Sequence, residues 1–225
     1  MEEALFARSA LLLGEEALEA LARRSVLLFG VGGVGSFVAE GLARSGLGRI
    51  TLVGNDTVAP SNCSRQLVAL HSTLGQPKAQ VMRDRILDIN PACQAEALCL
   101  FYGPETRDAV DFSAYDYVVD AIDTVSAKIA VAEKAREYKI PLISSMGTGN
   151  KLHGELFQIG DLSETSVCPL CRVMRRELQK RGIEHLKVLY STQPPIPPQA
   201  PEKGADEGKR LPPGRLSFVP PLPVL

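Results

Sequence analysis

Three charged side chains and a glycine-rich stretch are the parts of this 225-residue chain whose types and spacing could do chemistry. Residues 30–35 read GVGGVG, Arg65 and Lys78 follow near expected helix starts, and Asp123 comes after a short apolar run. Glycines let a backbone approach a phosphate closely, and two cations can clamp one anion. Mg²⁺ accepts carboxylates together with substrate phosphates. The pattern predicts a phosphate site, although solvated surface charges at positions 65 and 78 would explain the same spacing.

The glycine stretch lies between two segments of different periodicity. Residues 26–29 (VLLF) predict a short buried strand, and residues 36–46 (SFVAEGLARSG) predict a helix that stops at its final glycine. A G-x-G-x-x-G motif in this context places a phosphate on the N–H groups at the helix start. The alternative is a turn that only joins strand to helix. The glycines concerned are Gly30, Gly32, Gly33 and Gly35.

Strands and helices alternate along the rest of the chain. This alternation, with glycines at strand ends, predicts an α/β fold with a Rossmann-like, doubly wound and mainly parallel sheet. His153 falls within an expected strand, where a packed or surface histidine is commoner than a catalytic one. We expect further strands at 49–53, 93–101, 116–120, 140–145 and 151–159, and helices at 2–23, 78–90, 125–138 and 172–180.

Acidic residues near two strand ends bear on the ligand. Asp123 follows the carboxyl end of strand 116–120, where parallel α/β sheets bind ligands, but the same residue could cap the next helix. Asp120 lies nearer the strand, so we expect it to be structural. Dinucleotide folds carry a ribose-binding acid after the second strand, whereas this chain has Gly54 there and its acid two residues later, at Asp56. The offset weakens an interpretation as a plain NAD site.

Composition limits the class of protein. The formal net charge of −1 gives no global attraction to nucleic acid or membrane. The five cysteines and an acidic N-terminus without a signal-peptide core favour a reducing, cytoplasmic compartment. No apolar stretch is long enough to cross a bilayer. From residue 193 the chain is rich in proline, which predicts a mobile loop and tail over residues 193–225, with 216–219 docking as a short extended piece.

Two features near residue 170 leave alternatives open. Cys168 and Cys171 form a CxxC pair, which could be half of a zinc site, but the remaining cysteines supply no second pair. A redox pair is the other possibility. The helix that follows is strongly basic, which by default is a solvated face and is also the best local candidate for contact with an RNA backbone. Its basic residues are Arg172, Arg175, Arg176, Lys180 and Arg181.

Five short motifs, in order, resemble those of the ubiquitin-activating-enzyme-like adenylyltransferase superfamily, which includes the activators of thiamine and molybdopterin sulfur carriers. The resemblance covers about residues 5–190. Within that superfamily, the opening RSALLLG, the absence of paired zinc cysteines and the stretch RVMRRELQKRGI look most like the tRNA threonylcarbamoyladenosine dehydratases. The five motifs are GVGGVGS at 30–36, SNxxRQ at 61–66, GxPK at 75–78, INP at 89–91 and DxxD at 120–123.

The resemblance implies an ATP-binding domain over residues 1–192 and assigns roles to individual residues. Arg65 and Lys78 match residues on the triphosphate, Asn62 matches a polar asparagine of the ATP site, and Asp123 matches the aspartate associated with Mg²⁺. Arg8 matches an arginine that in relatives reaches into the partner subunit's ATP site, so a homodimer is implied. The expected catalytic residues are Arg8, Arg65, Lys78 and Asp123.

Two departures from the family pattern concern the ribose and the C-terminus. The family usually has an acid, within a DxD pattern, where this chain has Gly54. That acid is expected to hold the ribose, so Asp56 or Asn55 would have to replace it. Relatives also continue past an FVP-like strand into a hydrophobic helix, whereas residues 218–225 read FVPPLPVL.

The resemblance implies that a substrate carboxylate attacks the α-phosphate of ATP, with Mg²⁺ present, and that pyrophosphate leaves. In the dehydratase interpretation the carboxylate belongs to a threonyl group on a tRNA adenosine, and an internal nitrogen closes a ring with release of AMP. The alternatives are activation of a ubiquitin-like sulfur carrier, with a carrier or cysteine desulfurase system protein as partner, and a catalytically weakened relative. An NAD dehydrogenase is weaker still, because SNxxRQ and Lys78 have no role in it.

Overall fold

The computed structural model describes residues 5–197. The chain divides into two compact units, residues 1–144 and residues 145–225. The expected domain boundary at residue 192 stays a prediction. Most of the proline-rich segment 193–225, including the expected docking piece at 216–219, lies outside the described residues.

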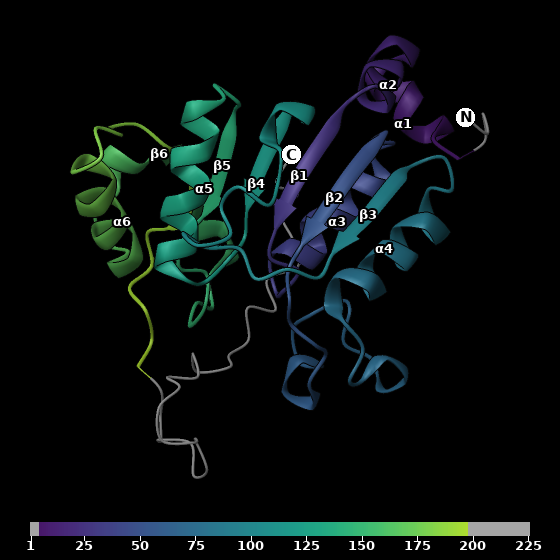
Figure 1. Ribbon diagram of the computed structural model, residues 1–225. Helices are drawn as coiled ribbons and strands as arrows, with labels where there is room; N and C mark the ends of the chain where they lie inside the picture. Colours follow the sequence, from purple (N-terminus) through teal and green to yellow (C-terminus); the bar gives the residue numbers. More distant parts are fainter. Residues whose placement is uncertain (1–4, 198–225) are drawn as a thin grey trace. The chain divides into compact units, whose positions relative to one another are not determined.

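Five parallel strands form the sheet of the first unit, in the order β3-β2-β1-β4-β5 (Figure 1). The chain builds outward from β1 in one direction and then returns to β4 on its other side, so the strand order reverses between β1 and β4. Ligands of such sheets bind outside the carboxyl ends of the strands at this reversal. The strands are β1 (Ser25–Phe29), β2 (Arg49–Val53), β3 (Gln94–Leu98), β4 (Tyr117–Asp120) and β5 (Leu142–Ser145).

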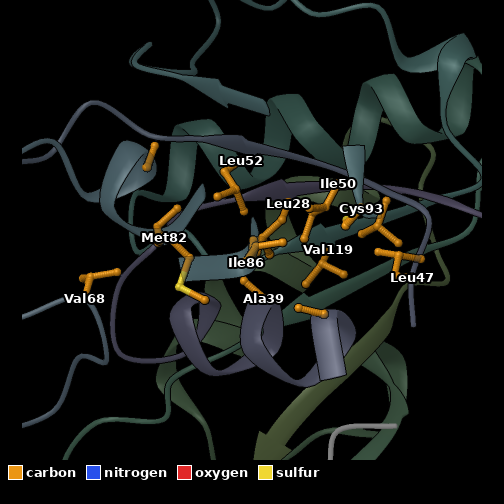
Figure 2. Close-up of a cluster of buried hydrophobic side chains, with 14 of the residues drawn as sticks. Leu28, Ala39, Leu47, Ile50, Leu52, Val68, Met82, Ile86, Cys93 and Val119 are labelled. Atoms are coloured by element: carbon orange, nitrogen blue, oxygen red, sulfur yellow. The ribbon is translucent and has the colours of Figure 1, made fainter. Parts of the chain in front are cut away.

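Helices cover both faces of this sheet, and alternate residues of β1 enter two separate cores. Leu28 packs with α3 (Gly35–Arg44) and α4 (Lys78–Ile89), and Figure 2 shows Leu28 among buried side chains of both helices. Phe29 packs on the opposite face with α5 (Val125–Glu137). Burial on both faces explains why β1 reads as an uninterrupted apolar run. The predicted doubly wound, parallel fold is confirmed.

The N-terminal helix expected over residues 2–23 is wrong as one element. Two helices occupy the described part of it, α1 (Ala7–Leu13) and α2 (Glu15–Ala22). Gly14 between them has φ 83, a left-handed conformation that cannot continue an α-helix and that glycine adopts at low cost. In Figure 1 both helices lie at the end of the sheet where β1 begins.

The second unit contains an antiparallel pair, β6 (Phe157–Asp161) and β7 (Lys187–Ser191), and α6 (Pro169–Gln179) between them in sequence. The strand expected over 151–159 begins only at β6, because the residues before it form a 3₁₀ turn, η4 (Gly154–Leu156). His153 therefore lies outside the strand, and its Nδ1 is 2.9 Å from Glu155 Oε1 at the surface. The other short helices are η1 (Pro60–Asn62), η2 (His71–Thr73), η3 (Phe112–Ala114) and η5 (Leu162–Glu164). Within residues 5–197, no helix is both long and apolar enough to cross a membrane.

Candidate functional site

The glycine turn connects β1 to α3 along a path that only glycine can follow. Gly30 has φ 86, and a Cβ there would lie 2.6 Å from the carbonyl oxygen of Ala121. A Cβ on Gly35 would lie 1.8 Å from the carbonyl oxygen of Gly30. Among residues 5–197, no side chain caps the N-terminus of α3. The turn thus packs against the loop after β4 and leaves a helix start of the kind that binds anions.

The segment that carries the SNxxRQ motif packs on the glycine turn. The Ser36 hydroxyl is fully buried, donates to the Gly32 carbonyl at 2.6 Å and accepts from the Leu67 N–H at 3.3 Å. The Arg65 stem crosses Gly33, where a Cβ would be 3.8 Å from Arg65 Cγ. The structure therefore brings Arg65 to the glycine turn, as the motif order predicts. Ser36 was not recognised from the sequence, although it directly follows the glycines.

Lys78 is held by Asp56 at the start of α4. Its Nζ lies 3.0 Å from Asp56 Oδ2, and its backbone N–H donates to the Asp56 carbonyl at 2.9 Å. The Lys78 side chain is 9% exposed, whereas that of Asp56 is 73% exposed. The cation is thus fixed in position by a carboxylate that faces water. The two predicted residues lie together, but the Asp56 carboxylate is engaged with Lys78.

Asn62 and Gly54, two other positions of the expected nucleotide site, differ in how closely they are packed. Asn62 is buried, and its Oδ1 accepts the Ala59 N–H at 3.0 Å, which closes the turn before η1. This local structural contact was not foreseen. Gly54 is open, since the nearest atom to a Cβ built there is the Val31 nitrogen at 4.0 Å. The Gly54 N–H donates to the Leu98 carbonyl at 3.1 Å, which continues the sheet ladder.

The loop after β4 is anchored by a buried ion pair. Asp120 is 1% exposed, and its Oδ2 lies 2.9 Å from Lys128 Nζ and accepts from the Ser144 hydroxyl. Its Oδ1 accepts the Ile122 N–H at 3.1 Å. The expected structural role of Asp120 is confirmed. Lys128 was missed, and the available signal was one lysine on an otherwise apolar stretch of α5.

Asp123 emerges from this loop as an exposed carboxylate. The helix α5 takes Thr124 as its N-cap, so the alternative in which Asp123 caps the helix is wrong. Phe29 pairs with Asp120 in register, and the next residues along, Gly30 and Ala121, pack on each other. The glycine turn and the Asp123 loop therefore leave the sheet side by side.

Arg8 lies away from these residues. It is exposed on α1, and the neighbouring Phe6 packs 3.6 Å from the position of a Cβ on Gly46. Gly46 follows the C-terminal end of α3, whereas the glycine turn precedes its N-terminal end. A ten-residue helix is about 15 Å long, so Arg8 and the glycine turn lie at opposite ends of α3. The expectation that Arg8 acts in a partner's site stays a prediction.

The basic helix α6 is less basic at its surface than its sequence implies. Arg175 turns inward, donates to the Leu162 carbonyl at 3.1 Å and contacts Thr165. Three further cations share one carboxylate on Glu177, which reduces the field available to a polyanion. They are Arg176 at 3.3 Å, Lys180 at 2.8 Å and Arg181 at 3.3 Å. Contact with RNA through this helix stays a prediction.

The CxxC cysteines are buried near the N-terminus of α6, with Cys168 at 2% and Cys171 at 0% exposure. In the part of the chain that the structure describes, no group of three or more His, Cys, Asp or Glu side chains could hold a metal ion. The half zinc site considered from the sequence thus has no second half among residues 5–197.

Comparisons with known proteins show the family and the fold. The model of the ThiF family matches residues 6–193. A tRNA threonylcarbamoyladenosine dehydratase of Bacillus subtilis is 46% identical over 223 residues, which is 96% of this chain and 88% of the relative. That of Escherichia coli is 36% identical over 203 residues, or 87% of this chain and 76% of the relative. Its crystal structures with AMP and with ATP align with TM-scores of 0.83 and 0.81, covering 88% and 87% of this chain and 84% of each of theirs.

Proposed function

Because the chain belongs to the ThiF family, we propose that it is an ATP-dependent enzyme that dehydrates N6-threonylcarbamoyladenosine in tRNA to a cyclic product. The observation that carries the proposal is the convergence of the glycine turn, Arg65 and the Asp123 loop at the carboxyl ends of β1 and β4. This convergence occurs in a chain whose fold matches a dehydratase solved with ATP. Activation of a sulfur carrier is the less favoured alternative, because the two relatives described above are dehydratases.

We assign each of the predicted site residues a part in binding ATP. The glycine turn, Gly30, Gly32, Gly33 and Gly35, presents backbone N–H groups to the phosphates. Arg65 and Lys78 bind the triphosphate oxygens, and Asn62 and Asp56 are further polar residues of the ATP site. In each case the group acts by position and charge, which suits a reaction whose transition state spreads negative charge over phosphate oxygens.

A Mg²⁺ ion fits Asp123. The carboxylate is exposed, it lies on the loop packed against the glycine turn, and its Oδ1 accepts a long hydrogen bond, 3.4 Å, from the Thr124 hydroxyl. One carboxylate with substrate phosphates is the donor set that Mg²⁺ commonly accepts. When bound there, the ion would neutralise charge on the phosphates. The anchored Asp120 keeps the loop, and thus Asp123, in place.

The reaction has two steps. A carboxylate oxygen of the threonyl group attacks the α-phosphorus of ATP, the bond to pyrophosphate breaks, and an acyl-adenylate forms. An internal N–H nitrogen of the modified base then attacks the acyl carbon, the C–O bond to AMP breaks, and the nitrogen gives its proton to water. The chain supplies orientation and electrostatic stabilisation, and no cysteine of the enzyme takes part.

A homodimer belongs to the proposal. Helix α1 exposes an apolar stretch beside Arg8, with Leu11 at 89%, Leu12 at 85% and Leu13 at 52% exposure. Three consecutive exposed leucines are costly in water and are typical of a surface that a partner covers. A second copy seated there would carry Arg8 toward the partner's ATP site. We also expect the enzyme to act in the cytoplasm, in keeping with a tRNA substrate.

The test is release of AMP and pyrophosphate from Mg-ATP by the purified chain. We expect release only with tRNA that carries threonylcarbamoyladenosine, together with loss of one water from the nucleoside by mass spectrometry. The same tRNA without the modification and a ubiquitin-like carrier protein are the comparison substrates. Lys78→Ala should abolish release, and Lys187→Ala, an exposed lysine of the second unit, should not. AMP formation that survives Lys78→Ala would show that the site is wrongly assigned.

A further inference from the structure

We propose that Cys168 and Cys171 form an oxidisable dithiol, in which hydroperoxides attack Cys168 and Cys171 then closes a disulfide. The pair is not used by the proposed adenylation chemistry. It lies in the second unit, whereas the glycine turn, Arg65, Lys78 and Asp123 lie in the first. The inference therefore stands independently of the proposed function.

The position of the two cysteines on α6 brings their sulfurs together. Cys168 is the N-cap of the helix and Cys171 is its third residue. The Cys168 sulfur lies near the N–H groups of Leu170, Cys171 and Gly147, and a Cβ on Gly147 would lie 3.3 Å from it. Pro169, at the first position, has no N–H to offer. The same C-x-x-C spacing at a helix start occurs in disulfide oxidoreductases.

The hydrogen bonds at the helix start divide the pair into a thiolate and a thiol. A hydrogen bond from the Cys171 thiol, followed by N–H groups of Cys171, Gly147 and Leu170, lowers the pKa of Cys168 to about 5, against the opposing effect of burial. That same thiol hydrogen bond, with burial, raises the pKa of Cys171. At neutral pH Cys168 is thus the nucleophile and Cys171 keeps its proton. The thiolate is the form that peroxides oxidise.

A buried lysine supplies the counter-charge. Lys151 is 2% exposed, and its ammonium donates to the Gln193 carbonyl. Burial lowers the pKa of Lys151, while the charge of the Cys168 thiolate acts in the opposite direction and favours the cationic form of Lys151. A buried charge is tolerated when it is paired, so the thiolate and the ammonium stabilise each other. Arg175 on the same helix also favours ionisation of Cys171.

The burial of Cys168 and Cys171 limits the size of the oxidant that can reach them. With 2% and 0% of the two residues exposed, a small neutral hydroperoxide can reach the sulfur more readily than a bulky disulfide. The Cys168 thiolate attacks one peroxide oxygen, the O–O bond breaks, and the leaving oxygen takes a proton from water. The resulting sulfenic acid is attacked by the Cys171 sulfur, whose proton leaves with the hydroxide as water. Two thiols and one hydroperoxide thus give a disulfide, one water and one alcohol, or two waters when the oxidant is hydrogen peroxide.

The experiment compares cysteines within one full-length chain. The reduced protein is treated with increasing hydrogen peroxide, quenched, alkylated and analysed by peptide mass spectrometry. We expect the peptide that holds Cys168 and Cys171 to lose both alkylation sites and two hydrogens at a lower dose than Cys63 and Cys99, although those two are exposed. A dithiol reductant should restore both sites. Earlier loss of Cys63 or Cys99, or no disulfide at any dose, would overturn the proposal.

Two variants separate the roles of the sulfurs. Cys171→Ser should leave a sulfenic acid on Cys168 that a dimedone probe captures. Cys168→Ser should leave Cys171 alkylatable at the dose that oxidises the wild type. Equal oxidation of Cys171 in the Cys168→Ser protein would contradict the assignment of Cys168 as the thiolate. Because the wild-type dose series needs neither variant, the proposal stays testable if a variant fails to fold.

Discussion

Replacing Gly54 with aspartate tests whether the end of β2 holds the ribose of ATP. Gly30 donates its N–H to the Val53 carbonyl at 2.8 Å, so the residue after β2 lies beside the glycine turn. The nearest atom to a Cβ at position 54 is 4.0 Å away, and Gly54 is not among the residues with positive φ. An aspartate should therefore fit without strain and place a carboxylate where the family pattern has one.

The expected gain in affinity follows from simple magnitudes. A hydrogen bond to a charged group is worth about 1.5–3 kcal/mol, which corresponds to roughly a 10- to 100-fold lower Kd. Repulsion between the new carboxylate and each phosphate charge costs only ~0.4 kcal/mol at about 10 Å in a water-like dielectric, and Mg²⁺ bound to the triphosphate would offset part of the sum. The hydrogen bond outweighs the repulsion, so Gly54→Asp should bind ATP more tightly.

Calorimetric titration with ATP and with 2′,3′-dideoxy-ATP measures the effect. The Gly54→Asp chain should gain affinity for ATP and not for the dideoxy analogue, which lacks both ribose hydroxyls. Gly54→Asn is the matched control, because it has the same size without the charge and should gain less. An equal gain for both nucleotides, or no gain for either, would refute the placement of the ribose beside position 54.

Three further predictions concern other parts of the chain. Lys128→Met should lower the free energy of unfolding in urea by about 3–5 kcal/mol, because it leaves the Asp120 carboxylate buried and unpaired, and adding Asp120→Asn should recover part of the loss. Leu12→Ser should raise the Kd of a dimer about tenfold or more in analytical ultracentrifugation, since burial of a leucine is worth about 1.5–3 kcal/mol; an unchanged Kd would exclude α1 from the interface. The lowered pKa of Cys168, about 5, means that between pH 5 and the unfolded value near 8.5 the unfolded chain holds one more proton than the folded chain. Stability should therefore rise with pH across this window in the wild type, and Cys168→Ser should flatten the rise in urea titrations at successive pH values.

The secondary structure was predicted best from the sequence where a short stretch of residues determines its own conformation. The strand at β1, the glycine turn and α3 were expected because glycine spacing and apolar periodicity are local signals. The break at Gly14 was missed because leucines and alanines on both sides favour helix. β7 (Lys187–Ser191) was missed because it pairs with β6 from a distant position in the sequence. Strand pairing of this kind depends on tertiary contacts more than on intrinsic preference.

The candidate site shows the same division between local and distant causes. Asp123 could be picked out because it follows a strand end, but the ion pair of Asp120 with Lys128, which anchors its loop, joins residues on different elements. A lysine in a helix usually faces water, and only the fold shows that Lys128 faces a carboxylate. The pair of Asp56 with Lys78 was likewise invisible in the sequence, since 22 positions separate them.

The contacts of Arg65 and Lys78, the two cations proposed to bind phosphate, bear on which ligands the site accepts. Arg65 Nη1 donates to the Ser61 carbonyl at 2.9 Å, and Lys78 Nζ is paired with Asp56 at 3.0 Å. An anion must therefore exchange with existing oxygen partners. The exchange at Lys78 is eased because the Asp56 carboxylate is 73% exposed and regains water when an anion takes its place. A ligand with several phosphate oxygens can replace both partners at once, whereas a single phosphate can offset only one of them. We therefore expect the site to bind a triphosphate more tightly than a monophosphate, so that AMP would leave once pyrophosphate has gone.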